Sequence, residues 1–362
     1  MKRNPTKCEK WRVKRQKTGV FAAGSDEMRV RMVEFAGDFL PVTGLSVMKV
    51  IQQLAELPAA HEQAVIINCG TKWVSTLALL SCRRHAAMPV LIIDCESADG
   101  SREHFETLAR ERGVDFHWLS WPLRPHGDTL DRLLREIRSE MVLLVDSDVE
   151  IREAQVVAEM QQQLVANKQA YGAGFLQPAG WLGPPHHLLP PQTGYYAERM
   201  WIPLVLLRVE CVRAALTAGA SFIARRPFQE ISGHPRLSRL LGYRIRIPLL
   251  RSLRLPQWLC KAEPGDFVID GVKPAFVDHD TGAELHLRLT LGGHPFVKLD
   301  EALWGQVHHY HGVTRARIGG WFRALAAKTG MVSKETQAAP LSAEEDARNR
   351  LREQYGFEQN KK

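Results

Sequence analysis

Two carboxylates stand one residue apart directly after an apolar run in the segment MVLLVDSDVEI, residues 141–151. The apolar run is typical of a strand buried in a parallel sheet, and α/β proteins bind ligands at the carboxyl ends of such strands. If the strand continues through the pair, Asp146 and Asp148 point to the same face, because side chains alternate along a strand. Carboxylate oxygens suit hard divalent cations. The segment therefore predicts a metal site, with an ordinary Asp-containing turn as the competing interpretation.

A second polar group follows another apolar run, in LIIDCESADGS at residues 91–101. Asp94 ends the predicted strand, and a carboxylate there can accept hydrogen bonds from a nucleotide base or ribose. The Ser/Asp/Gly turn leads into a helix that Asp99 could cap. A helix-capping turn without any ligand is the alternative interpretation.

Two later segments also carry groups suited to chemistry. The segment VDHDTGAELHLRLTLGG, residues 277–293, places Asp278 and Asp280 before a predicted helix. The segment VHHYHGVTR, residues 307–315, places three imidazoles within four residues, His309 and His311 among them. Histidine is a common metal ligand, so the cluster is a candidate part of the same site.

The elements that must position these residues alternate along the chain. Apolar runs predict strands at 64–68, 89–94 and 114–119, before the strand that ends in the acidic pair. Helical spacing predicts helices at 72–84, 101–112 and 128–138 between them. This alternation predicts an α/β fold with a doubly wound, mainly parallel sheet.

Further elements are predicted after the acidic pair. The patterns indicate helices at 153–167, 203–218 and 280–291, with strands at 170–176 and 295–299. Residues 178–194 form a loop rich in Pro, Gly and His. Such a long irregular stretch inside a domain is either functional or disordered.

Three parts of the chain are expected. Residues 1–60 are predicted to form a basic tail and a helical extension with an apolar helix at 45–57, residues 61–315 the main domain, and residues 316–362 a helical tail. In that tail Ser342 and Glu345 have the spacing of a capping box at a helix start.

Composition limits the class of protein. With 362 residues, 45% hydrophobic and 24% charged, the chain is long enough for a substantial core and is not disordered by composition. The six cysteines have no zinc-binding spacing, and we expect them to be reduced. The basic N-terminus lacks the apolar core of a signal peptide, and no apolar stretch reaches the length of a membrane span.

The charge distribution suggests where the protein acts. The net charge of +8 favours acidic partners, and residues 234–261 form an arginine-rich amphipathic stretch. This stretch is either a solvated face or an attachment to an anionic membrane surface. We therefore expect a protein that is cytoplasmic or is bound peripherally to the cytosolic face of a membrane.

The order of these segments resembles the family-2 type of GT-A glycosyltransferase. The matching runs are AVIIN, LIIDCESADGS, VLLVDSDVEI, DHDTGAELHLRLTLGG and HHYHG, over about residues 62–315. Such enzymes show a strand ending in Asn, a VDDGSTDGT-like turn, a DxD strand, an ED-containing helix and a late HxxG. The resemblance implies an inverting transfer of a sugar from a nucleotide-sugar donor to a hydroxyl acceptor. The arginine-rich stretch at 234–261 suggests a lipid-linked or envelope polysaccharide acceptor at a membrane surface, in cell-envelope or surface polysaccharide synthesis.

The resemblance also implies roles for individual residues. A divalent cation, Mn²⁺ or Mg²⁺, would be held by Asp146 and Asp148 with His309 or His311, and it would bridge the donor diphosphate. Asp280 would be the catalytic base. The residues that would bind the donor nucleotide or its sugar are Asn68, Asp94, Ser97, Asp99, Asp146 and Trp201. The acceptor would be a saccharide or a lipid-linked saccharide, and no nucleic-acid partner is expected.

The chain departs from the family pattern at two positions. His279 replaces the Glu that precedes the catalytic Asp, which makes Asp278 a second candidate for the base, and Glu198 a third. Cys95 replaces the second Asp of the VDDGS turn, which leaves the base and sugar of the donor open. Trp201 is either a sugar-stacking ring or a packing residue of the core.

Two other function classes explain parts of the sequence. A haloacid-dehalogenase-like phosphatase would use Asp146 as nucleophile, Asp148 as acid/base and GDFVID at residues 265–270. That fold expects its nucleophile on the first core strand, whereas three strands are predicted before Asp146. A non-enzymatic basic adaptor for nucleic acid or membrane accounts for the charge but leaves the carboxylates and imidazoles without a role.

Overall fold

The computed structural model describes residues 48–181, 194–225, 276–310 and 334–357, with residues 268, 271–272 and 274 between them. The chain divides into two compact units, Met1–Thr43 and Gly44–Lys362, and all described residues belong to the second unit. His311, the arginine-rich stretch at 234–261 and most of the GDFVID segment lie outside the described residues.

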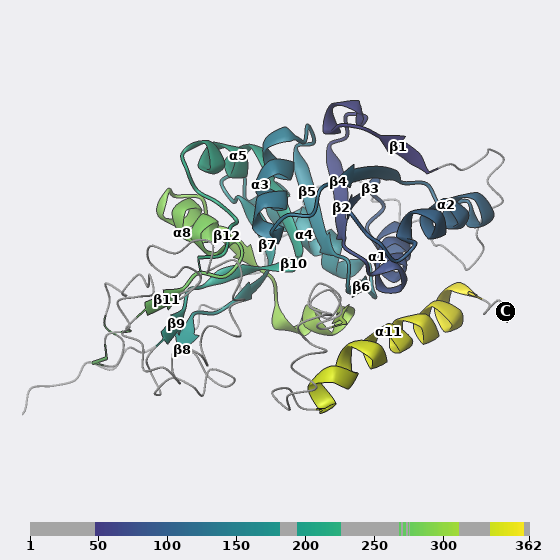
Figure 1. Cartoon of the computed structure of the whole chain (residues 1–362). Helices are drawn as coiled ribbons and strands as arrows, with labels where there is room; N and C mark the ends of the chain where they lie inside the picture. The colour runs from purple at the N-terminus through teal and green to yellow at the C-terminus, as the bar shows by residue number, and fades with distance from the viewer. Residues whose placement is uncertain are drawn as a thin grey trace, which may run out of the picture. The chain divides into compact units, whose positions relative to one another are not determined.

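The centre of the second unit is an eight-stranded sheet with the strand order β1-β4-β3-β2-β5-β10-β7-β12 (Figure 1). Strands β1, β4, β3, β2 and β5 pair in parallel, β10 runs antiparallel to β5 and β7, and β12 is parallel to β7. The strands are β1 (Lys49–Ile51), β2 (Glu62–Asn68), β3 (Val90–Cys95), β4 (His117–Trp121), β5 (Met141–Asp146), β7 (Gly172–Gln177), β10 (Arg199–Arg208) and β12 (Phe296–Lys298). The prediction of an α/β fold with a doubly wound, mainly parallel sheet is confirmed.

The order in which the chain adds strands to the sheet changes direction at β2. From β2 the chain proceeds through β3 to β4 on one side, and it then returns to form β5 on the other side of β2. Connecting helices α1 (Lys72–His85) and α2 (Ser101–Arg112) contribute to one core cluster, whereas α3 (His126–Glu136) contributes to the other. In open α/β sheets such a switch point leaves a crevice outside the carboxyl ends of the strands, where ligands bind.

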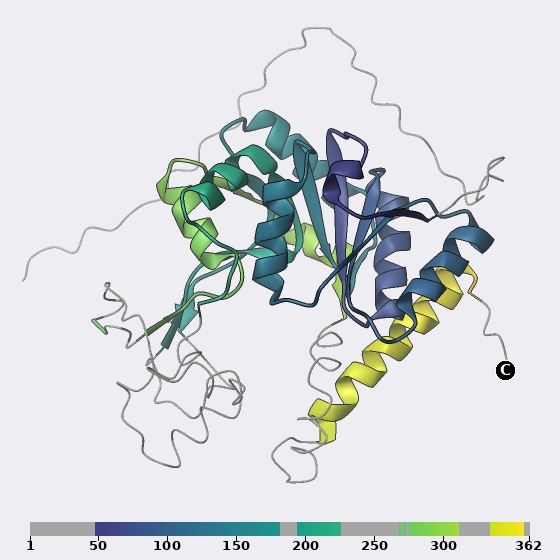
Figure 2. The same cartoon turned by 45° about the horizontal axis from the view of Figure 1, so that its top comes forward.

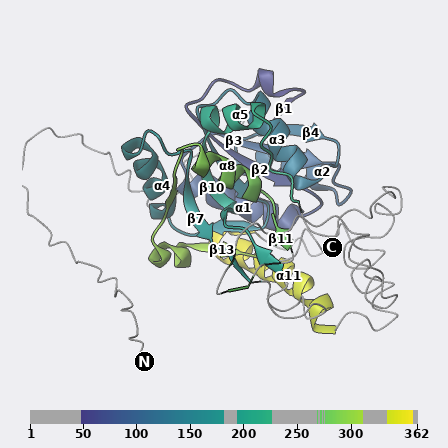
Figure 3. The ribbon, with the colours of Figure 1, turned by 90° about the vertical axis from the view of Figure 1, so that its left-hand side faces the viewer.

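Each face of the sheet is covered by its own set of helices. One core cluster joins the sheet to α1, α2, α4 (Gln155–Ala166) and α11 (Lys334–Tyr355), through residues such as Leu77, Phe105, Met160 and Leu351. The other joins it to α3, α5 (Val209–Thr217) and α8 (Ala283–Leu291), through residues such as Leu133, Val212 and Leu285. Figure 3 shows α3, α5 and α8 together on one side of the sheet and α11 on the opposite side.

Two small sheets carry residues of interest. In one, β6 (Val149–Ile151) pairs antiparallel with β13 (Val307–His309), directly after the short helix η3 (Glu301–Gln306). In the other, β9 (Gly194–Tyr196) lies between β11 (Phe276–Asp278) and β8 (Gly180–Trp181). The predicted loop at 178–194 thus contains β8, and its residues 182–193 lie outside the described residues.

Three predicted elements are wrong. The helix expected at 45–57 is instead β1 and the short helix η1 (Leu54–Glu56). Pairing of Ile51 with Leu119 at the sheet edge supplies the backbone hydrogen bonds that a helix would have made internally. The capping box at Ser342 is also absent, because α11 already begins at Lys334 and Ser342 lies inside it.

The third error is the helix predicted over 203–218. Its first part belongs to β10, and only Val209–Thr217 is helical, as α5. Strand β10 lies between β5 and β7, and its residues 204–207 are all buried. A strand covered on both faces and a buried helix give the same continuous apolar run, so the pattern does not separate them.

Two findings bear on the remaining sequence-based expectations. In the described part of the chain, Cys69, Cys82, Cys95 and Cys211 are free thiols, and burial raises the pKa of Cys82 and Cys95 to about 12. Such thiols behave as small buried hydrophobes. None of the described helices has the length and hydropathy that a membrane span requires.

Candidate active site

The acidic pair lies at the switch point of the sheet, at the carboxyl end of β5 and beside β2. Asp146 is the last residue of β5, while Ser147 and Asp148 form a turn before β6. The pair is therefore not on one continuous strand, and the expectation of a shared strand face is wrong. The turn still brings both residues to the rim of the sheet, with the Asp146 side chain 27% exposed and the Asp148 side chain 9% exposed.

His309 reaches the acidic turn from a distant part of the sequence. Strand β13 places His309 opposite Val149 of β6, and the backbone N–H of Tyr310 donates to the carbonyl of Asp148 (2.8 Å). As a result, His309 Nε2 lies 3.2 Å from Asp148 Oδ1. The structure thus brings together two of the predicted metal ligands, and His311 lies outside the described residues.

A histidine that the sequence analysis did not single out also faces the acidic pair. His126, the first residue of α3, has its Nε2 3.8 Å from Asp146 Oδ1. Gly127 permits the close approach of this helix start to residues 222–223, because a Cβ there would lie 2.6 Å from the Ile223 Cα. A single histidine with no neighbouring motif gives no sequence signal, so only the fold identifies His126.

Asp94, at the end of β3, is held by a buried hydrogen-bond network. Asn68 Nδ2 donates to Asp94 Oδ1 (2.7 Å), and the Ser97 hydroxyl donates to the same oxygen (2.5 Å). The Asn68 amide oxygen in turn accepts from the hydroxyls of Thr71 (2.9 Å) and Ser75 (2.7 Å). Asn68 is fully buried, whereas Asp94 is 7% exposed. Asn68 therefore holds the Asp94 carboxylate from its buried side.

Asp99 connects the starts of two helices. Its Oδ2 accepts from the backbone N–H of Lys72 in α1 (3.1 Å), and its Oδ1 accepts from the backbone N–H of Ser101 in α2 (3.1 Å). The N-cap position of α2 is Gly100, so Asp99 lies one residue before it and binds the first N–H of the helix. Both carboxylate oxygens thus satisfy helix N-termini, and this alone accounts for an Asp at this position.

A further contact joins the ends of β2 and β5. The Thr71 hydroxyl, in the loop after β2, lies within hydrogen-bond distance of the Ser147 hydroxyl in the acidic turn (3.1 Å). The ends of β2, β3 and β5 therefore form one connected polar rim.

Trp201 lies in an aromatic cluster next to the acidic turn. Its ring centroid is 4.6 Å from that of Trp304, 6.0 Å from Phe175 and 5.6 Å from His309. Trp304, in η3, is 47% exposed although it is a large apolar residue. Trp201 is therefore a packing residue that also contacts the site, and Trp304 presents the exposed ring.

Asp280 and Asp278 lie near the start of α8, and both are buried. Asp280 Oδ2 lies 2.9 Å from the Nη2 of Arg199, and Asp280 Oδ1 accepts from the backbone N–H of Thr281 (2.9 Å). Nearby, Glu198 Oε1 lies 3.3 Å from His286 Nε2. Burial lowers the pKa of His286, and Glu198 opposes that shift.

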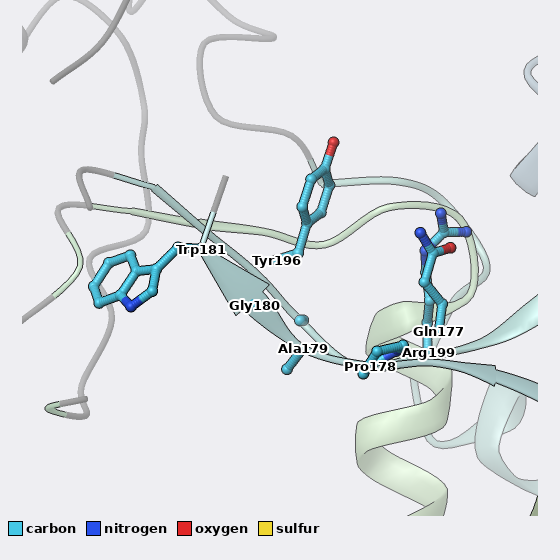
Figure 4. Close-up of a pocket in the computed structure, with 8 residues that line it drawn as sticks. Gln177, Pro178, Ala179, Gly180, Trp181, Tyr196 and Arg199 are labelled. Carbon is cyan, nitrogen blue, oxygen red and sulfur yellow. The ribbon is translucent and has the colours of Figure 1, made fainter. Parts of the chain in front are cut away.

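A cavity of about 250 Å³, which Arg199 helps to line, opens nearby (Figure 4). It lies between the ends of β7 and β10 and the hairpin of β8 and β9, where Gln177 pairs in register with Arg199. Figure 4 shows the Gln177 and Arg199 side chains next to each other, with Tyr196 and Trp181 further along the hairpin. Aromatic rings together with an amide and a guanidinium are the groups that bind the faces and hydroxyls of sugars.

No three His, Cys, Asp or Glu side chains are arranged to hold a metal ion within the described part of the chain. The chemistry of the acidic turn nevertheless suits one. Two carboxylates and the His309 imidazole are oxygen and nitrogen donors of the kind that Mn²⁺ accepts, and His309 is already beside Asp148. The donor set therefore fits a divalent cation in kind.

No protein-family model and no curated protein sequence matches this chain. Solved structures to which it is similar include the mannosyltransferase PcManGT from Pyrobaculum calidifontis in complex with GDP-Man and Mn²⁺, at 13% identity and a TM-score of 0.34. That match covers 49% of this chain and 50% of the other.

Two further solved structures are similar over comparable parts of the chain. One is S. aureus TarS in complex with UDP-GlcNAc, at 14% identity and a TM-score of 0.31, with 45% of this chain and 49% of that chain covered. The other is 4-diphosphocytidyl-2C-methyl-D-erythritol synthase from Anaerococcus prevotii, at 9% identity and a TM-score of 0.33, with 44% and 75% covered. The match spans about half the length of the mannosyltransferase and TarS chains.

Proposed function

We propose that this protein is a metal-dependent glycosyltransferase that moves a sugar from a nucleotide-sugar donor to a hydroxyl acceptor with inversion at the anomeric carbon. The observation that carries the proposal is the acidic turn at the switch point of the sheet, with His309 Nε2 3.2 Å from Asp148 Oδ1. A ligand crevice is expected at this place in a parallel sheet. Carboxylates and an imidazole are side chains of the kinds that ligate a divalent cation, which supports the proposal.

Asp146, Asp148 and His309 would hold Mn²⁺ or Mg²⁺, with His311 as a further candidate. A cation bound there would neutralise the negative charge that develops on the leaving nucleoside diphosphate. The other side chains of the rim act on the donor directly. Asp94 would accept hydrogen bonds from the nucleotide, because Asn68 and Ser97 fix its carboxylate close to the rim.

The acceptor would bind in the cavity beside Arg199. There Asp280 would take the proton from the acceptor hydroxyl as the hydroxyl oxygen attacks the anomeric carbon on the side opposite the leaving diphosphate. The Arg199 guanidinium, 2.9 Å from Asp280 Oδ2, would hold the Asp280 carboxylate in place. Asp278 remains the second candidate for this role, and Glu198 the third.

The acceptor class and the cellular setting belong to the same proposal. A saccharide or a lipid-linked saccharide at the cytosolic membrane face, in envelope polysaccharide synthesis, agrees with the basic charge and with the aromatic lining of the cavity. Binding of the full chain to vesicles with and without anionic lipid tests the membrane part. Equal binding to neutral and anionic vesicles would contradict the membrane part of the proposal.

A thermal-shift panel tests the core of the proposal. Nucleoside diphosphates and nucleotide sugars are added with and without Mn²⁺, because a ligand that binds only the native state raises its apparent stability, by about 2.7 kcal/mol at 100 times Kd. We expect one nucleotide to stabilise the protein only when Mn²⁺ is present. Stabilisation by none of them, or an effect that ignores the metal, contradicts the proposal.

No observation favours the two rival functions. Asp146 ends the fifth of the strands that the structure describes, rather than the first core strand that a haloacid-dehalogenase-like phosphatase requires. A nucleic-acid adaptor would leave the polar rim without a role. A salt titration of nucleic-acid binding separates it from the enzyme, because phosphate-driven binding weakens steeply with salt.

A further inference from the structure

Glu150 is a buried acid next to the proposed metal site and is not part of it. It lies on β6, two residues after Asp148, and is only 2% exposed. Its Oε1 accepts from Arg350 Nε (2.7 Å), and its Oε2 accepts from Arg152 Nε (3.2 Å) and from the Tyr310 hydroxyl (3.2 Å). A buried carboxylate is tolerated only when charge and hydrogen bonds compensate it, so these partners are required.

Of these three partners, Arg350 comes from the far end of the chain. It belongs to α11, which packs along α1 (Figure 1, Figure 2). Ala347, Leu351 and Tyr355 anchor the helix in the core cluster. Arg112 of α2 donates to the carbonyls of Tyr355 (2.6 Å) and Gly356 (2.7 Å) and so fixes the helix end.

The contacts of Glu150 connect α11 to the two strands that carry the site. Tyr310 follows His309 directly, and its backbone N–H donates to the Asp148 carbonyl. The hydroxyl of the same tyrosine donates to Glu150 on β6, and Arg350 donates to that carboxylate from α11. The hydrogen bond to Glu150 raises the pKa of Arg350, so the guanidinium remains charged.

We infer that Arg350 is a positioning residue: through Glu150 and Tyr310, helix α11 fixes the pairing of β6 with β13 and so holds Asp148 beside His309. The inference rests on the proposed function for the chemistry at Asp148. It assigns to the C-terminal helix a role in organising the metal site, in addition to covering the sheet. Hydrogen bonds around metal ligands commonly change metal affinity about 10–100-fold when removed.

The test uses the full chain with Arg350→Gln, and Arg348→Gln as the matched control. Arg348 is on the same helix and lies over the Trp73 ring (4.7 Å), with an ion pair to Glu344, but the structure gives it no contact with Glu150. The first measurement is amide hydrogen exchange of residues 148–151 and 307–310 in metal-free protein. We expect exchange there to be about tenfold faster in Arg350→Gln and unchanged in Arg348→Gln.

The second measurement is a Mn²⁺ titration of nucleotide binding. We expect Arg350→Gln to weaken the apparent Mn²⁺ affinity about tenfold, with Arg350→Lys recovering part of it and Arg348→Gln leaving it unchanged. If Arg350→Gln does not fold, Tyr310→Phe replaces it, because that change removes one bond to Glu150 and keeps the ring. Its expected effect is in the same direction and smaller.

The two measurements separate the two claims. Unchanged exchange in Arg350→Gln and in Tyr310→Phe, or equal acceleration in the Arg348→Gln control, overturns the positioning role. If exchange responds as expected while no nucleotide binds with Mn²⁺ in the wild type, the positioning role stands and the proposed function fails.

Discussion

The two halves of the candidate site are built in different ways. At the ends of β2 and β3, direct hydrogen bonds join Asn68, Asp94 and Ser97, and Asp99 accepts from the first backbone N–H groups of α1 and α2. At the acidic turn and the acceptor cavity, the groups come from segments far apart in the sequence: β5–β6, β13, β10 and the residues before α8. The first half is local in the sense that residues 68–101 supply all of it, whereas the second depends on how distant elements pack.

The difference suggests a division of labour. The half at the ends of β2 and β3 would be a rigid binding site for the nucleotide, the part of the donor that does not react. The half assembled by packing holds the groups of the reacting centre, and it contains the ion pair of Asp280 with Arg199. We therefore expect changes in the second half to alter the reaction, and changes in the first half to alter mainly stability and nucleotide affinity.

The largest expected effect is at Asp280. Asp280→Asn should lower the transfer rate about 10²–10⁴-fold, because general base catalysis contributes that much. Mn²⁺-dependent nucleotide binding should persist, as measured by thermal shift. Asp278→Asn is the control: if it has the larger effect on the rate, the base is Asp278.

Asp148→Ala should remove the Mn²⁺ dependence of nucleotide binding, a loss of about 10²–10³-fold in affinity. An isothermal titration with and without Mn²⁺ measures it. Glu103→Ala, an exposed acid in the first turn of α2, is the control and should change nothing. A metal titration that is the same in Asp148→Ala and wild type rules out the acidic turn as the cation site.

Acid should destabilise the protein through His104, which packs under the first half of the site. Burial lowers its pKa from 6.5 to about 4, with a further contribution from Lys72. Below pH 6.5 the unfolded chain therefore binds a proton that the folded chain does not, so stability falls as pH falls from 6.5 to 4. The loss at pH 4 is about 3 kcal/mol.

His104→Asn isolates this contribution. Urea unfolding at pH 7 and pH 4 should show a smaller acid-induced loss in the variant than in the wild type. The His104 ring hydrogen bond to Thr76, 2.8 Å, is weakened at both pH values and cancels in the comparison. Equal losses in both proteins would mean that another group causes the acid sensitivity.

Asn68→Ala should lower the free energy of unfolding by about 2 kcal/mol, because buried hydrogen-bonding groups of Thr71, Ser75 and Asp94 lose their partner. Chemical denaturation measures the change. We expect turnover at saturating donor to fall much less than in Asp280→Asn. A large loss of turnover without a loss of stability would contradict the division between the two halves.

The smallest effect is expected at Trp304. Trp304→Ala should raise KM for a saccharide about tenfold, since a stacked aromatic ring contributes about 0.5–1.5 kcal/mol. Steady-state kinetics measures the change, and we expect the rate at saturating saccharide to be unaltered. Trp304→Phe should recover most of the affinity, and a variant with unaltered KM would leave the exposed ring without a role in binding.

The sequence by itself determined the parallel half of the fold and the groups at its rim. The segments from β2 to β5 have the predicted alternation, because each strand is a short apolar run and each helix has its own periodicity and turn residues. The pair Asp146 and Asp148 was evident for the same reason. Local pattern decides these features, since neighbouring residues suffice to specify them.

Tertiary structure decided the rest. Residues 49–51 and 203–208 form strands because pairing partners far along the chain satisfy their backbone, which no local pattern records. Contacts between segments that are distant in sequence likewise position the side chains of His126, Arg199, Trp304 and Arg350. Long-range packing sets such contacts, so the sequence indicated Asp146, Asp148, His309 and Asp280 but not the distances between them or these additional neighbours.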